Sequence, residues 1–145
     1  MTNCGRIEIN RELVLLESWY ETGKRSRITT TNGVYYSTEP PLALIGKAHL
    51  MIACTHNLRL KATRHNLKSY EKHIVLYSKD GISAYPTQSP SAFTCIWIFN
   101  HQYTMEFVSP TRTRIIYKQF GIFKEIDTSI HHLCKQRKRQ RELFS

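Results

Sequence analysis

The stretch Ile28-Thr29-Thr30-Thr31-Asn32-Gly33-Val34-Tyr35-Tyr36-Ser37 carries the clearest fold signal in this sequence. β-Branched and aromatic residues, which favour strands, flank the central Asn32-Gly33 pair on both sides. Both central positions of a type I′ turn need a positive φ, which Asn and Gly tolerate. The stretch therefore predicts an antiparallel β-hairpin that turns at Asn32-Gly33.

Similar signals predict two more hairpins further along the chain. Residues 73–85 alternate around a turn at Lys79-Asp80-Gly81, and residues 93–108 are β-rich on both sides of Asn100-His101-Gln102. Because each turn is short and polar, we expect each pair of flanking strands to be neighbours in a sheet.

Shorter apolar runs predict additional strands. Residues 13–20 fit either a strand or a short helix, because periodicity does not separate the two over so few residues. Residues 42–45 and 48–54, on either side of Gly46, predict buried strand. Residues 111–117 form another β-rich run.

From Asp127 onward the pattern changes to that of a helix. Asp127 or Thr128 is a suitable N-cap. The apolar residues follow helical spacing: Ile126, Ile130, Leu133 and Cys134. The predicted fold is mainly β (α+β), with antiparallel hairpins that form a sandwich or partly open barrel, and one C-terminal basic helix. We expect a single domain, with a β-rich globular part over 1–126 and a C-terminal helix ending in a basic tail over 127–145.

The chain is strongly basic, with a net charge of +10 and an isoelectric point near 9.7 over 145 residues. Residues 1–21 hold four glutamates against two arginines, so the positive charge belongs to the middle and the end. Such a protein meets nucleic acid, an acidic membrane surface or an acidic partner. No apolar run approaches the ~20 residues of a membrane helix, and no signal peptide is recognisable. We therefore expect a soluble protein inside the cell, with no membrane partner.

The most polarised segment is 135–141, which has five cations in seven residues: Lys135, Arg137, Lys138, Arg139 and Arg141. Such a run binds a polyanion or serves as a nuclear localisation signal, and both uses need the same clustered cations. A solvated helix end that keeps the protein soluble is the alternative without a binding role.

A secondary basic patch lies between residues 56 and 73. Its cations are interleaved with His65, Tyr70 and His73, which can stack on unpaired bases. Arg112 and Arg114 are two positions apart and so lie on one face of a strand. They extend the patch if that strand lies beside it. The cations are Arg59, Lys61, Arg64, Lys68, Lys72, Arg112 and Arg114. An ordinary basic strand and loop explains the same pattern.

Aromatic residues at Tyr35, Tyr36, Trp97 and Phe99 are expected in the core or in cross-strand pairs.

We expect no metal and no other cofactor. The alternative is a zinc site built from Cys54 and His56 on a strand together with His131 and Cys134 on the helix, although this spacing matches no established zinc pattern. We also expect no enzyme, since catalytic motifs are missing and the carboxylates are scattered.

In composition the chain resembles small accessory proteins of viruses as a type, being short, very basic and poor in Asp, with a terminal Arg/Lys run. The resemblance implies a regulator such as a suppressor of RNA silencing. We expect a non-enzymatic nucleic-acid-binding accessory protein, with RNA or single strands favoured, located in nucleus and cytoplasm. The alternative is an adaptor with a host protein partner, whose basic tail only engages an import receptor. Oligomeric state and sequence specificity stay open.

Overall fold

The computed structural model describes residues 8–48, 50–54, 59–61 and 74–142. Within them, eight antiparallel strands form the larger of two sheets, in the spatial order β3-β2-β1-β8-β7-β6-β4-β5. In chain order the strands are β1 (Leu13–Glu21), β2 (Lys24–Thr30), β3 (Gly33–Ser37), β4 (Met51–Cys54), β5 (Arg59–Lys61), β6 (Val75–Tyr77), β7 (Ser83–Pro86) and β8 (Ile96–Phe99). The sheet is open, with β3 and β5 at opposite edges.

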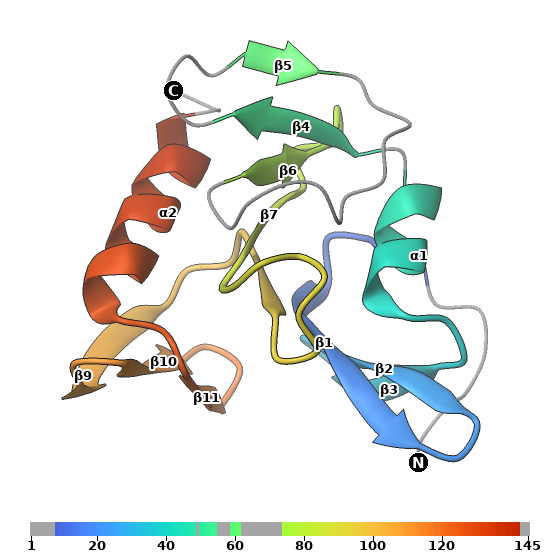
Figure 1. The fold of residues 1–145 in the computed structure, drawn as a ribbon, viewed down its shortest axis with the longest axis horizontal. Coiled ribbons are helices and arrows are strands. Elements are labelled where there is room, and N and C mark those ends of the chain that lie inside the picture. Colours follow the sequence, from blue (N-terminus) through green and yellow to red (C-terminus); the bar gives the residue numbers. More distant parts are fainter. Residues whose placement is uncertain (1–7, 49, 55–58, 62–73, 143–145) are drawn as a thin grey trace.

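A second, three-stranded sheet has the order β11-β10-β9. It is formed by β9 (Thr104–Ser109), β10 (Arg112–Tyr117) and β11 (Ile122–Ile126). Two helices complete the described part, α1 (Pro41–Lys47) and α2 (Ile130–Glu142), and they lie on opposite sides of the molecule (Figure 1). The expected mainly antiparallel β fold with a C-terminal helix is confirmed. Its sheets do not close into a barrel among the described residues.

The larger sheet is buried on both faces. On β8, Trp97 and Phe99 pack in one apolar cluster with Leu44 of α1. The alternate residues Ile96 and Ile98 pack in a second cluster, with residues of the small sheet and of α2. The successive apolar residues of β8 are therefore all buried, because side chains of a strand alternate between faces.

β1 contributes to both clusters through an irregular register. Its pairing with β2 shifts between Leu13 and Leu15. As a result Leu13 and Leu16 both belong to the α1 side, whereas Val14 and Leu15 belong to the α2 side. A local bulge of this kind lets four consecutive apolar residues be buried on the two faces. The ambiguous run 13–20 is thus a strand.

α2 begins at a serine cap and packs on the sheets through one face. The Ser129 Oγ accepts a hydrogen bond from the His132 backbone N–H at 3.2 Å. Leu133 is fully buried in the second cluster. The Gln136 amide donates to the carbonyl oxygens of Ile74 and Pro86, at 3.4 Å each, and so connects α2 with the residue before β6 and with the end of β7.

Several local predictions need correction. The cap of α2 is neither Asp127 nor Thr128, because the Asp127 carboxylate pairs with Arg112 and the Thr128 hydroxyl donates to the Thr87 carbonyl. The hairpin between β2 and β3 is confirmed, but Thr30 pairs with Gly33, so its loop is Thr31-Asn32.

Residues 42–45 are helical, not strand, since they belong to α1. Pro41 occupies the first helical position, where a missing N–H costs nothing. Leu44 and Ile45 of the same helix are buried. Of 48–54, only Met51–Cys54 is strand.

The hairpin predicted across 100–102 does not exist, although the one across 79–81 is confirmed. β8 already pairs with β1 on one side and with β7 on the other. No edge of β8 remains for β9, and β9 pairs with β10 in the smaller sheet.

Candidate nucleic-acid interface

The cations of α2 fall into two structural groups. Lys135, Lys138 and Arg141 are exposed, and three-residue spacing places them within an arc of about 120° on the helix. Arg137 and Arg139 are half-buried. The fully buried residues of the helix lie on the other side, so the exposed row faces outward while the helix stays packed.

The two half-buried arginines are held by neighbouring groups. The Arg137 guanidinium lies over the Tyr103 ring, 5.2 Å from its centroid, and donates to the Tyr103 carbonyl oxygen at 3.2 Å. The Arg139 guanidinium donates to the Gln136 side-chain oxygen at 2.9 Å. Neither interaction involves a carboxylate, so neither of these contacts balances the positive charge of the arginines.

A buried tyrosine cluster supports Arg137. The Tyr85 and Tyr103 hydroxyls are hydrogen-bonded, and the Tyr103 and Tyr117 rings lie 5.3 Å apart. Burial raises the pKa of Tyr103 to about 12, although the bond with Tyr85 and the charges of Arg137 and Arg141 act in the opposite direction. The cluster is therefore neutral at physiological pH. Sequence spacing did not indicate that Tyr103 positions a cation of α2.

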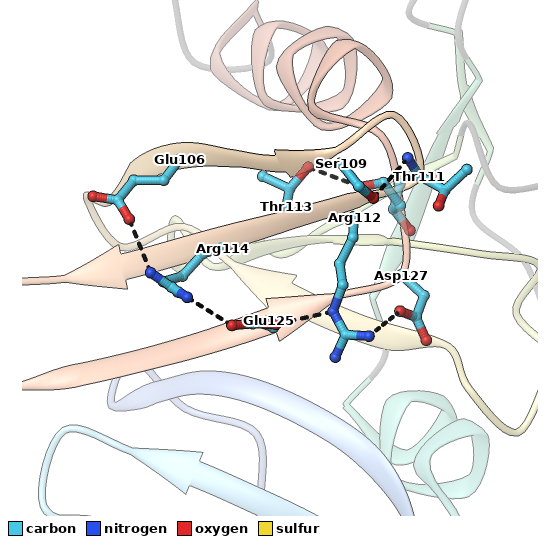
Figure 2. A network of polar contacts seen from close by, with 9 residues as sticks. Glu106, Ser109, Thr111, Arg112, Thr113, Arg114, Glu125 and Asp127 are labelled. Carbon is cyan, nitrogen blue, oxygen red and sulfur yellow. Dashed lines mark hydrogen bonds and ion pairs between the residues drawn. The ribbon is translucent and has the colours of Figure 1, made fainter.

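None of the five α2 cations forms an ion pair within the described part of the chain. The arginines of β10 contrast with them (Figure 2). Arg112 pairs with Glu125 at 3.0 Å and with Asp127 at 3.2 Å. Arg114 pairs with Glu125 at 2.8 Å and with Glu106 at 3.3 Å.

This β10 network neutralises its own cations, since two guanidinium groups face three carboxylates. The bond from Arg114, followed by the charges of both arginines, holds the pKa of Glu125 below its usual value. The Glu125 partner likewise raises the pKa of Arg114. Arg112 and Arg114 do share one strand face, as predicted, but that face offers no excess positive charge to a polyanion.

The rest of the secondary basic patch is only partly placed. Arg59 and Lys61 lie in β5, the edge strand next to β4, and nothing further is described of their side chains. Arg64, Lys68 and Lys72, with His65, Tyr70 and His73, fall outside the described residues. Their role in binding stays a prediction.

The zinc hypothesis also falls partly outside the described residues. His131 and Cys134 are both exposed, one turn apart on α2. Cys54 ends β4, and His56 lies outside the described part. Where the structure describes side chains, no group of three His, Cys, Asp or Glu is placed to hold a metal ion. The four-residue zinc site therefore remains untested.

Neither α1 nor α2, the helices of the described part, has the length and apolar character to cross a membrane.

Cations clustered along the exposed face of a helix are an electrostatic footprint of nucleic-acid binding, because Lys and Arg neutralise phosphates. A family model described as "ComK protein" matches residues 5–144, which is nearly the whole chain. The chain therefore belongs to the ComK family, a family of bacterial DNA-binding competence transcription factors. No curated protein and no solved structure matches the chain.

The family overturns the viral interpretation. The chain is not a viral accessory protein or a suppressor of RNA silencing, because it belongs to a bacterial regulator family. The expected nuclear location is wrong as well, since bacteria have no nucleus. Nucleic acid as the class of partner agrees with the family, whereas neither the preference for RNA nor an import receptor has support. The ComK family is a family of transcription factors, which are not enzymes.

Proposed function

We propose that this chain is a DNA-binding transcription regulator that contacts the phosphates of duplex DNA through the exposed face of α2. The observation that carries the proposal is the row Lys135, Lys138 and Arg141, exposed and without a carboxylate partner among the described residues. The row is about 9 Å long at the helical rise of about 1.5 Å per residue.

The packing of α2 supports this role. Leu133 and Gln136 hold the helix on the sheets, so that binding needs no rearrangement of the helix. The Tyr103 contact orients Arg137 beside the row and reduces the side-chain entropy that binding would cost. Phosphate contacts place a protein on DNA, and they carry no sequence information by themselves.

The test is the salt dependence of duplex-DNA binding. A triple variant with Lys135→Gln, Lys138→Gln and Arg141→Gln removes the exposed row. Counterion release predicts that the slope of log K against log salt becomes less steep by about 2 to 3. Fluorescence anisotropy with one labelled duplex over a salt series measures this slope.

A matched control removes the same charge elsewhere. Arg25, Lys79 and Lys118 are exposed, lie outside α2 and form no ion pair in the described part. Their combined change to Gln should leave most of the salt slope intact. Equal effects of the two triple variants would show that net charge, not α2, determines binding. Undetectable DNA binding by the unmodified protein at low salt would contradict the proposal outright.

A further inference from the structure

We infer that a pocket between α2 and the loop 100–103 binds a phosphate group. The pocket has a volume of about 350 Å³, at the lower end of the range for small-molecule sites. No carboxylate lines it. The lining residues are Ser83, Asn100, His101, Gln102, Tyr103, Arg137, Gln140 and Arg141.

Two cations contribute to the pocket wall from successive turns of α2. Residues four apart on a helix are neighbours, and Arg137 and Arg141 have this spacing. Arg137 is oriented by the Tyr103 ring and carbonyl. Arg141 is exposed and has no ion pair in the described part. Because the pocket adjoins the C-terminal turn, whose carbonyls repel anions, binding there depends strongly on these guanidinium groups.

Two buried polar side chains in the same wall have no hydrogen-bond partner among the described residues. The Ser83 Oγ belongs to a fully buried residue, and the Gln140 Nε2 to one that is 4% exposed. Buried polar groups are nearly always paired, so two residues with such unpaired atoms in the wall of one pocket favour a ligand that supplies acceptors. A phosphate has several acceptor oxygens and can satisfy both donors together with the arginines.

The loop that lines the pocket is held in place by hydrogen bonds between the Asn100 side chain and the backbone. The Asn100 side-chain oxygen accepts from the Ser83 N–H at 3.0 Å, and its amide donates to the Gly81 carbonyl at 2.8 Å. These bonds hold the loop against β7 where the chain leaves β8. The loop residues that line the pocket are therefore preorganised, which lowers the entropic cost of binding a ligand.

The position of the pocket points to DNA as the source of the phosphate. Arg137 and Arg141 also line a hollow on the exposed side of α2, together with Cys134, Lys138 and Glu142, so that three cations face one carboxylate there. The pocket thus adjoins the row proposed to contact DNA, and this assignment of the source rests on the proposed function. A free phosphorylated molecule offers the same chemistry.

Binding of inorganic phosphate by the full-length protein tests the pocket itself. Isothermal titration at constant ionic strength, with chloride as the reference anion, should detect phosphate binding. Ser83→Ala and Arg141→Gln should each weaken it about 10-fold, the value of one hydrogen bond to a charged group. Lys135→Gln, the charge-matched control on α2 but not in the pocket wall, should weaken it by at most about 2-fold because exposed charges are screened.

Ser83→Ala separates binding from stability. Its hydroxyl has no partner to lose, so the thermal midpoint without phosphate should not fall. Phosphate binding no stronger than that of chloride would overturn the inference. Equal phosphate affinities for Ser83→Ala, Arg141→Gln and Lys135→Gln would overturn it too.

The DNA experiment distinguishes the two sources. If DNA supplies the phosphate, Arg141→Gln lowers duplex affinity more than Lys135→Gln does, and inorganic phosphate competes with DNA at constant ionic strength. If a free molecule supplies it, the two variants lose duplex affinity equally, phosphate does not compete, and the pocket assignment still stands. Phosphate binding without any duplex binding would support the pocket and contradict the proposed function.

Discussion

Glu125 is the residue that links the two arginines of β10. Its carboxylate bonds to Arg114 and Arg112, and these bonds hold its pKa below the usual 4.5. A carboxyl group with a lowered folded-state pKa stabilises the fold above its unfolded-state pKa. That contribution is lost as the pH falls through the folded-state pKa.

We therefore predict a pH-dependent effect of Glu125→Gln. The variant should be less stable than the unmodified protein at neutral pH, and the difference should shrink as the pH falls below 4.5. Urea unfolding of both proteins over a pH series measures the difference. Glu8→Gln, which removes a carboxylate without an ion pair in the described part, is the control. A Glu125→Gln difference that does not change with pH would contradict the prediction.

Residue chemistry was predictable where it is local. Trp97 and Phe99 are buried, as their apolar character indicated. Whether a cation pairs with a carboxylate was not predictable from the sequence. Arg112 and Arg137 look alike in sequence, yet the first is neutralised by carboxylates and the second lies on a tyrosine ring.

At the scale of the element, α2 depends on its first turn as well as on its packed face. The Ser129 hydroxyl satisfies one of the N–H groups that have no partner within the helix. Ser129→Ala should therefore lower the free energy of unfolding by about 1 kcal/mol. Chemical denaturation monitored by circular dichroism measures the loss.

Ser129→Asp is the matched variant, because a carboxylate also accepts at the cap and interacts favourably with the N-terminal end of the helix dipole. It should keep the stability of the unmodified protein. Equal losses for Ala and Asp would indicate that the serine acts through something other than capping.

Elements differ in how well local sequence determines them. The hairpin of β2 and β3 was expected from its turn, with its loop displaced by one residue. A short apolar run such as 42–45 is compatible with both strand and helix. It is helical here because α1 packs its apolar side chains on the larger sheet. β9 was predicted as a strand, but its partner depends on which sheet edges are free.

At the scale of the whole molecule, the two apolar clusters share the strands β1 and β8. Leu133 belongs to one cluster and Trp97 to the other, on opposite faces of the larger sheet. If β1 or β8 left the larger sheet, apolar residues of both clusters would be exposed. We therefore expect the β-rich part and α2 to unfold as a single domain.

Leu133→Ala tests this cooperativity. The fully buried leucine should cost about 2 to 5 kcal/mol on removal. Tryptophan fluorescence, which includes the signal of Trp97, and far-UV circular dichroism should report the same lowered midpoint. A fluorescence midpoint that stays at the unmodified value would show that the α1 side unfolds independently of α2.

The sequence by itself determined the fold class, the C-terminal helix and the clustering of cations along it. These properties follow from nearest neighbours along the chain: β-branched runs, a polar turn and charges a few residues apart. Only the tertiary structure decided which cations are unpaired, that β8 and β9 belong to different sheets, and that Ser83 lines the same pocket as Gln140 and Arg141. Such features depend on contacts between residues distant in sequence, which local propensity and periodicity do not encode.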